Sequence, residues 1–330
     1  MASGANQNYT GRFAPSPTGP LHAGSLLAAL ASYLDARAHG GRWLLRIEDV
    51  DLHRNVQGAT DLICRSLEAH RLFWDGDILQ QSTRDERYKQ ALQDLQASGD
   101  IFYCNCSRKM LKQLARGGNK AYPGYCREQR NVAYQAASAT QPASHAVRFA
   151  IGALPATAGN FDDRVLGPQC FDLMSLGDFI VRRRDGLFAY QLAVVVDDAE
   201  QAVTDVVRGA DLLDSTPWQL CLQRALGHPT PRYAHLPLLV HANAGGKLSK
   251  QTGAAAIDDR SAYNNLCLAL QQLGQTLPTS PTEKSAGDAA KIDALLAHAV
   301  ENWSISRVPR SPIAVPNKGD SAMSSQGPEN

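Results

Sequence analysis

The chain has 330 residues, 44% of them hydrophobic and 20% charged, and its formal net charge is +1. This composition is typical of a soluble globular protein, and the length allows one large α/β domain with an insertion, or two domains. The overall charge neither supports nor excludes a nucleic-acid partner, so the local distribution of charge has to decide that question.

The lack of a recognisable secretory signal and the use of cysteines point to a cytoplasmic protein. The N-terminal MASGANQNYT is polar and unlike a secretory signal, and no segment approaches the ~18 consecutive apolar residues that a spanning helix needs. The seven cysteines are an odd number spread along the chain, which favours reduced thiols over a disulfide framework. We therefore expect a cytoplasmic protein without a membrane partner.

Strand and helix patterns alternate over the first hundred residues. Strands are predicted at 9–14 and 42–47, and helices at 25–38, 56–70 and 83–97. The first strand runs into the turn PSPTGP, and the second ends in the acidic run Glu48, Asp49, Asp51. This order indicates a parallel sheet with crossover helices.

The rest of the chain divides into three parts. Residues 101–175 carry clustered cysteines, a Gly-Gly pair and several prolines, which predicts an inserted subdomain. The sheet pattern then returns in FIVRRR, LFAYQLAVVVDD and VTDVVRG, followed by a helix near 216–226. Helical pattern continues over 259–305, and the tail from about Pro309 is rich in Ser, Pro, Gly and Asn, which predicts disorder.

Two short motifs suit phosphate chemistry. His22-Ala23-Gly24-Ser25 lies in the turn between the first strand and helix, where backbone N–H groups favour an anion, Gly24 leaves room and His22 can donate. Taken alone, a plain turn with a surface histidine explains this motif more often. The loop GGKLSKQ carries Lys247 and Lys250, whose ammonium groups suit the charge that builds on departing pyrophosphate.

In this order the two motifs resemble the His-Ile-Gly-His and Lys-Met-Ser-Lys-Ser signatures of class I aminoacyl-tRNA synthetases. RFAPSPTGPLHAGS, LLRIEDVD, FAYQLAVVVDD and VVRGADLL followed by HLPLL are similar to the glutamyl branch, and the resemblance covers roughly residues 10–255. Ser25 stands in place of the second His of the first signature, and Gln251 in place of the last Ser of the second. His22 and Lys250 are kept.

The resemblance implies an α/β fold, the Rossmann-like parallel-sheet catalytic domain of class I synthetases. Its two halves would be residues 1–100 and 176–258, separated by a zinc-binding subdomain at 101–175. A short helical C-terminal segment at 259–308 and the disordered tail at 309–330 would follow.

A glutamate pocket needs a cation for the side-chain carboxylate and an anion for the α-ammonium group. The planar fork of arginine suits the first task, and Arg12 and Arg208 lie at sheet edges that face a crevice in this kind of fold. Glu48 supplies an anion nearby. Asp197 and Asp198 either help to hold Mg²⁺ or an amino group, or close a turn at a strand end.

The resemblance assigns further residues to the site. Glutamate would be bound by Arg12, Ala14, Ser16, Glu48, Tyr190 and Arg208. ATP, with Mg²⁺, would be bound by Pro15, His22, Gly24, Ser25, Lys247, Ser249 and Lys250. Of these, His22, Lys247 and Lys250 would be catalytic and would stabilise the transition state of adenylate formation.

Three cysteines of the insertion, Cys104, Cys106 and Cys126, are close enough in sequence to reach one tetrahedral Zn²⁺. The usual C-x-x-C spacing is missing, so two half-buried cysteines on a short strand are the alternative, and either Tyr122 or Tyr125 is a candidate fourth ligand. In the resembling family the pattern C-x-C…Y-x-x-x-C falls on Cys104, Cys106, Tyr122 and Cys126, which implies one structural zinc per chain.

The same segment is basic, with seven Lys or Arg and one acid between Cys104 and Arg130. It suits a phosphate backbone, although a solvated face explains it too. Only 79 residues follow Gln251, which we expect to be too few for the helical anticodon-reading region of a full glutamyl-tRNA synthetase.

A core without that region resembles the glutamyl-Q tRNA(Asp) synthetase family. This implies an enzyme that forms glutamyl-adenylate without tRNA and transfers glutamate to queuosine in the anticodon loop of tRNA(Asp). The sequence does not indicate an oligomeric state, and a monomer is the default expectation. The alternatives are an ordinary glutamyl-tRNA synthetase, a non-catalytic RNA-binding paralogue, and a small-molecule adenylating enzyme without an RNA partner.

Overall fold

The computed structural model describes residues 9–107, 109–111, 121–122, 124–128, 145–241, 255–279 and 287–315. The strands within these residues are β1 (Thr10–Phe13), β2 (Arg42–Ile47), β3 (Leu79–Gln80), β4 (Ile101–Cys104), β5 (Ala146–Phe149), β6 (Phe161–Asp163), β7 (Gly167–Gln169), β8 (Phe179–Arg182), β9 (Asp205–Gly209), β10 (Arg232–Leu236), β11 (Leu239–His241) and β12 (Ile313–Val315). The helices are α1 (Ala23–Ala38), α2 (Ala59–Ala69), α3 (Asp85–Ala97), α5 (Tyr125–Glu128), α6 (Leu173–Leu176), α7 (Tyr190–Glu200), α8 (Thr216–Ala225), α9 (Ala262–Gln272) and α10 (Asp288–Glu301). Short 3₁₀ turns lie at Leu52–Arg54, Gln81–Thr83, Ile151–Ala153, Ala156–Gly159, Ala210–Ser215, Asp259–Ser261 and Ile305–Arg307. No helix in this part of the chain is both long enough and apolar enough to cross a membrane.

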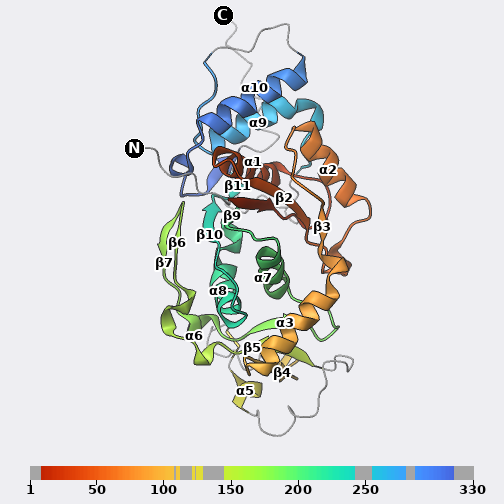
Figure 1. The fold of residues 1–330 in the computed structure, drawn as a ribbon, viewed down its shortest axis with the longest axis vertical. Helices are drawn as coiled ribbons and strands as arrows, with labels where there is room; N and C mark the ends of the chain where they lie inside the picture. The colour runs from red at the N-terminus through yellow and green to blue at the C-terminus, as the bar shows by residue number, and fades with distance from the viewer. Residues whose placement is uncertain are drawn as a thin grey trace, which may run out of the picture.

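Two sheets made mainly of parallel strands form the centre of the molecule (Figure 1). One has the order β1-β2-β3, and the other has the order β7-β6-β10-β9, in which only β7 runs antiparallel to its neighbour. The amide of Thr204, which precedes β9, donates to the carbonyl oxygen of Thr10 at 2.9 Å, so β9 lies beside β1. The carboxyl ends of β1, β2, β9 and β10 consequently face one crevice, as expected for an open parallel α/β fold.

Helix α1 forms the middle of the main hydrophobic core. Its apolar residues at helical spacing are buried, among them Leu26, Leu27, Leu30 and Leu34. It packs on β1 and β9 and on α9 and α10, which cover one end of the molecule (Figure 1). Burial of each leucine side chain contributes on the order of 2 kcal/mol, so the docking of α1 is a principal source of stability.

A buried carboxylate, Asp35, fastens α1 to three distant segments. It accepts hydrogen bonds from the hydroxyl of Tyr9, from Arg164 Nη1 and Nη2 at 2.5 and 3.0 Å, and from Trp303 Nε1 at 2.9 Å. Burial by itself would raise the pKa of Asp35, but the hydrogen bonds and charge of Arg164 lower this pKa below its usual value. Asp35 is therefore ionised and paired, and it joins segments that precede β1 and follow β6 and α10.

The insertion lies at the end of the molecule opposite α9 and α10 (Figure 1). Its antiparallel sheet has the order β4-β5-β8, with α5 packed on β4. Two boundaries differ from the prediction of an insertion at 101–175. The hairpin β6-β7 pairs with β10 of the central sheet, whereas β8, predicted to belong to the second catalytic half, pairs with β5. Strands of three or four residues carry too little periodicity to show which sheet they join.

The segment predicted as a strand in LFAYQLAVVVDD is instead the helix α7. The prediction was wrong because a continuous apolar run has no period that separates a buried strand from a buried helix. Every residue from Leu192 to Asp198 is buried, so all sides of this helix are covered. Asp197 and Asp198 consequently lie in its last turns and not at a strand end.

The predicted disorder from Pro309 is wrong for the residues that reach Val315. Strand β12 pairs in parallel with β11, and the amide of Ile313 donates to the carbonyl oxygen of Leu238 at 2.9 Å. Ile313 and Val315 also pack against the main core. A three-residue strand inside a polar stretch hardly changes the composition on which the prediction of disorder was based.

Candidate active site and thiol cluster

A cleft of about 700 Å³ opens where the carboxyl ends of β1, β2, β9 and β10 meet the start of α1. The structure brings ten predicted site residues together on its walls. These are Arg12, Ala14, Pro15, Ser16, His22, Gly24, Ser25, Glu48, Tyr190 and Arg208. The other three, Lys247, Ser249 and Lys250, lie outside the described residues.

The start of α1 is built to receive an anion. His22 is the N-cap residue, and its Nδ1 accepts a hydrogen bond from the backbone N–H of Ser25 at 3.2 Å. A neutral imidazole that accepts at Nδ1 carries its hydrogen on Nε2, which makes Nε2 a donor suited to a phosphate oxygen. A Cβ atom at Gly24 would lie 3.2 Å from the ring of His22 and would crowd it, so glycine at this position allows the ring to stay where it is. The positive end of the helix dipole adds to the attraction for phosphate.

On one wall of the cleft, two arginines and two carboxylates form a buried cluster. Arg12 Nε lies 3.1 Å and Arg46 Nη1 2.7 Å from the same oxygen, Oδ1 of Asp198, and Arg46 Nη2 lies 3.3 Å from Glu48 Oε1. Burial opposes ionisation of Asp198, but Arg12 and Arg46 lower the pKa of this carboxyl. Burial raises the pKa of Glu48, and the two arginines only partly offset it. Arg12 is therefore already paired with a carboxylate of the protein.

Asp197 faces away from this cluster and serves another purpose. Its carboxylate accepts hydrogen bonds from Gln81 Nε2 at 2.7 Å, Arg84 Nε at 2.6 Å and the Tyr88 hydroxyl at 2.8 Å. These three donors use its acceptor positions and attach α3 and the turn before it to α7. Neither Asp197 nor Asp198 thus has the exposed carboxylate that the predicted Mg²⁺ alternative requires.

Arg208 lies in β9, the strand beside β1, and is held by uncharged acceptors. Its Nε donates to His235 Nε2 at 3.1 Å, its Nη1 to the Tyr190 hydroxyl at 3.3 Å, and its Nη2 to Thr216 Oγ1 and Gln219 Oε1, each at 2.8 Å. Among the residues that the structure describes, no carboxylate forms an ion pair with Arg208. Its positive charge is consequently available to a negatively charged ligand in the cleft.

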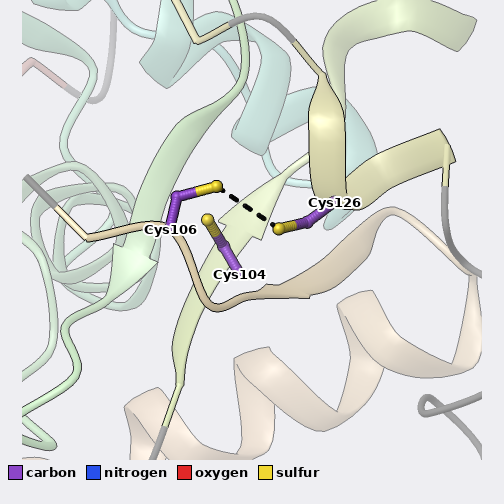
Figure 2. Close-up of side chains that lie close together, drawn as sticks. All are labelled: Cys104, Cys106 and Cys126. Carbon is purple, nitrogen blue, oxygen red and sulfur yellow. Dashed lines mark hydrogen bonds between the residues drawn. The ribbon is translucent and has the colours of Figure 1, made fainter. Parts of the chain in front are cut away.

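The three cysteines of the insertion converge at the end of β4 and the start of α5 (Figure 2). The sulfur atoms of Cys104, Cys106 and Cys126 all lie within 4.8 Å of one another, and those of Cys106 and Cys126 are 3.5 Å apart. Zinc–sulfur bonds of about 2.3 Å in a tetrahedron place sulfur atoms roughly 3.8 Å apart, so this spacing fits one zinc ion.

Tyr122 completes a four-atom set. Its hydroxyl lies 3.6 Å from the sulfur of Cys104 and 3.7 Å from that of Cys106, and it accepts from the backbone N–H of Cys126 at 2.8 Å. The side chain of Tyr125, the other candidate, is 42% exposed, whereas Tyr122 is buried. The geometry therefore favours Tyr122 as the oxygen partner of the three sulfurs.

Ionisation of the thiols shows why a cation suits the cluster. Burial opposes ionisation of Cys104, but hydrogen bonds from Arg148 and Tyr122 lower the pKa of its thiol. Burial and the contact with Cys126 raise the pKa of Cys106 to about 12, because neighbouring thiolates repel one another. A divalent cation bound by the sulfurs removes that repulsion.

Part of the predicted basic surface can be located. The arginines at 108, 116 and 130 and the lysines at 112 and 120 lie outside the described residues. Arg127 pairs with Asp178 at 3.0 Å. Outside that segment, in the run FIVRRR, Arg183 pairs with Asp51 at 3.0 Å. Arg184 Nη2 donates to the carbonyl oxygen of Asn105 at 2.7 Å, so two of the three consecutive arginines connect β8 with neighbouring segments.

Several residues that shape the cleft were not predicted. Arg46 pairs with Asp198, the carboxylate that holds Arg12 and for which the sequence indicated only Mg²⁺, an amino group or a turn. Asp163, His235, Thr216 and Gln219 surround Arg208 directly or through one another. His235 stands in the motif HLPLL that supported the family resemblance, which is a signal for its presence but not for its role. Asp163 lies in a short hairpin that carries no motif.

Comparisons with known proteins agree with this geometry. Residues 9–273 match the family described as tRNA synthetases class I (E and Q), catalytic domain. The chain is 49% identical over 315 residues to glutamyl-Q tRNA(Asp) synthetase of Chromobacterium violaceum, which covers 94% of this chain and 99% of that protein. The protein of the same name from Bordetella bronchiseptica is 52% identical over 274 residues, 81% of this chain and 82% of that protein.

A crystal structure of glutamate-tRNA synthetase from Elizabethkingia anophelis has the same fold, with a TM-score of 0.75 at 22% identity over 96% of this chain and 69% of that one. The strand order, the cleft at the strand ends and the close relatives all point to one group of ligases. The chain therefore belongs to the class I aminoacyl-tRNA synthetases and, within them, to the glutamyl-Q tRNA(Asp) synthetase family.

Proposed function

We propose that this chain uses ATP to activate L-glutamate as glutamyl-adenylate without tRNA, and then transfers glutamate to queuosine in the anticodon loop of tRNA(Asp). One observation carries the first half of the proposal. The same cleft contains a buried arginine without a carboxylate partner among the described residues and the anion-binding start of a helix. The names of the relatives support the second half.

Glutamate binds by charge complementarity. Arg208, assisted by the hydroxyl of Tyr190, binds the side-chain carboxylate, because its charge is not neutralised by the residues around it. Glu48 pairs with the α-ammonium group, and Arg12 contributes a second cation next to it. Ala14 and Ser16 line the space between these groups.

ATP binds along the start of α1, where Pro15, His22, Gly24 and Ser25 line the cleft. An α-carboxylate oxygen of glutamate attacks the α-phosphorus, and the bond to the bridging oxygen breaks as pyrophosphate leaves. His22 donates to a phosphate oxygen, and Lys247, Ser249 and Lys250 contact the phosphates from their loop. Mg²⁺ accompanies ATP and neutralises part of the phosphate charge.

In the second step, a hydroxyl oxygen of the queuosine cyclopentene ring attacks the carbonyl carbon of the mixed anhydride. The bond between this carbon and the phosphate oxygen breaks, AMP leaves, and the hydroxyl proton passes to the adenylate phosphate. An anticodon-loop base is unstacked and reachable, so the duplex does not have to melt.

The insertion holds a structural zinc ion through Cys104, Cys106, Tyr122 and Cys126. The fit of the sulfur spacing to a zinc tetrahedron supports this assignment. Four protein ligands leave no open position for a substrate, so the ion supports the insertion and takes no part in the chemistry. The enzyme that we propose acts as a monomer.

The deciding experiment uses labelled glutamate and ATP with bulk tRNA from cells that make queuosine and from cells that lack it. We expect acid-precipitable label only on the tRNA that contains queuosine. Equal labelling of both tRNA pools would instead identify an ordinary glutamyl-tRNA synthetase, and glutamate-dependent exchange of pyrophosphate into ATP without labelling of either pool would indicate a small-molecule adenylating enzyme.

A further inference from the structure

Behind Arg208, on the side away from the cleft, lies a buried pair that the proposed chemistry does not use. His235 Nδ1 is 2.6 Å from Oδ2 of Asp163, and neither side chain is exposed. The other ring nitrogen of His235, Nε2, is 3.1 Å from Arg208 Nε. Asp163, His235 and Arg208 thus form a chain of hydrogen bonds that ends at the cleft.

The donors and acceptors along these hydrogen bonds can be assigned, with the Thr216 hydroxyl as a second group 3.1 Å from His235 Nε2. Asp163 also accepts from the backbone N–H groups of Val165, Leu166 and His235, which fixes its carboxylate. Burial lowers the pKa of His235 and outweighs the hydrogen bond that the ring donates to Asp163, so the ring is neutral. A neutral ring next to a carboxylate carries its hydrogen on Nδ1, which leaves the lone pair of Nε2 for the N–H of Arg208.

We propose that Asp163 and His235 are positioning residues for amino-acid selection, which hold the guanidinium of Arg208 towards the ligand without neutralising its charge. The inference rests on the proposed activation of glutamate. A carboxylate in the place of His235 would hold Arg208 equally well but would cancel the charge that the ligand has to meet. The imidazole is itself held by Asp163, and it offers Arg208 an uncharged acceptor.

Arg12, another arginine of the cleft, shows what happens when a carboxylate holds the guanidinium group. Arg12 is held by the carboxylate of Asp198 at 3.1 Å, so much of its attraction for a second carboxylate is already used. Arg208 is fixed by a histidine, a threonine and a glutamine instead. Gln219 is itself oriented, because its Nε2 donates to Gln191 Oε1 at 2.9 Å and its oxygen is thereby left for Arg208. Arg208 is accordingly the group that distinguishes glutamate from the uncharged glutamine.

Two variants of His235 separate this role from simple packing. In His235→Gln, the amide oxygen comes close to the position of Nε2 and can still accept from Arg208. In His235→Asn, the amide comes close to the position of Nδ1, so the bond to Asp163 is kept and the acceptor for Arg208 is lost. The two side chains are similar in polarity and volume, and each serves as the control for the other.

The measurement is amino-acid-dependent exchange of pyrophosphate into ATP, with KM determined for glutamate, glutamine and ATP. Loss of one hydrogen bond to a charged group costs roughly tenfold in affinity, so we expect His235→Asn to raise the KM for glutamate by about that factor. The KM for ATP should stay within about twofold, and the preference for glutamate over glutamine should fall by roughly the same tenfold. His235→Gln should stay within about threefold of the unaltered enzyme in all three.

The outcomes that contradict the inference are distinct from failure of the proposed function. An unaltered enzyme without glutamate-dependent exchange overturns the proposed function and the inference with it. An active enzyme whose Asn and Gln variants behave alike, or lose glutamate and glutamine equally, overturns the inference alone.

If His235→Asn does not fold, as judged by thermal unfolding, Asp163→Asn carries the same test. Its oxygen can keep the backbone bonds, while its amide donates to Nδ1 and moves the ring hydrogen to Nε2, facing Arg208. The same loss of preference for glutamate is expected, and an unchanged preference would contradict the inference.

Discussion

Around the cleft, buried charged groups find their partners within the protein, whereas in the insertion three cysteine sulfurs mainly contact one another. Arg12, Arg46, Asp198 and Glu48 form ion pairs between 2.7 and 3.3 Å. The sulfurs of Cys104, Cys106 and Cys126 share one tyrosine hydroxyl and contacts of 3.5 to 3.7 Å. The charged groups beside the cleft are thus paired with one another, and the spacing of the three sulfurs is compatible with a bound metal ion.

The largest expected effect concerns the charge in the cleft. Arg208→Ala removes a cation that the surrounding residues do not neutralise, and loss of one member of a buried charge pair costs about 4 kcal/mol. This corresponds to a roughly thousandfold decrease in kcat/KM for glutamate in the exchange reaction. Arg208→Lys keeps the charge but lacks the planar fork, so an intermediate loss is expected. Unchanged kinetics in Arg208→Ala would show that Arg12 alone carries the carboxylate.

A smaller effect is expected at Asp35, which fastens the helix that forms the floor of the cleft. Asp35→Asn leaves the donors of Arg164, Tyr9 and Trp303 facing a neutral amide, which should lower the free energy of unfolding at pH 7 by about 3 kcal/mol. Urea denaturation measures the difference, with the exposed Asp77→Asn as the control, for which we expect almost no change.

The same pair of proteins should show a pH dependence of known sign. Because the pKa of Asp35 is lowered in the folded protein, its contribution is fully present above the unfolded pKa of about 3.9 and is lost as the pH falls through the folded value. The difference between the unaltered protein and Asp35→Asn should therefore shrink below about pH 4. A constant difference down to acid pH would contradict the lowered pKa.

The smallest effect on activation is expected from the insertion. Cys126→Ser should reduce the zinc content from about one ion per chain to less than roughly a tenth, measured by metal analysis of the purified protein. Glutamate-dependent exchange should fall by less than about tenfold, because the cleft residues do not contact the cluster. The exposed Cys170→Ser is the matched control and should keep its zinc. Loss of exchange in proportion to loss of zinc would show that the two regions are not independent.

Much of the fold and of the candidate site followed from patterns that local chemistry imposes. The strand before PSPTGP, the amphipathic α1 and the acidic end of β2 were predicted close to their observed bounds. The residues predicted to bind glutamate meet in one cleft because each stands at the carboxyl end of a parallel strand or next to it in space.

What could not be predicted depends on contacts between distant segments. Helix α7 is buried on all sides, so its sequence lacks the polar face that identifies a helix. The partners of Arg208 come from β10 and α8, and Asp163 comes from the hairpin β6-β7, 72 positions before His235 in the sequence. The spacing of these residues in the sequence does not predict such a network, because β6 and β10 become neighbours only in the folded sheet.

The long reach of Asp35 has a consequence for the order in which the protein folds during synthesis. Its partner Trp303 follows it by 268 residues, and the helices α9 and α10 that cover α1 also lie far behind it in the chain. A ribosome adds roughly ten residues per second, so α1 waits on the order of half a minute for its final cover. During that interval the apolar surface of α1 lacks the cover that α9 and α10 later provide.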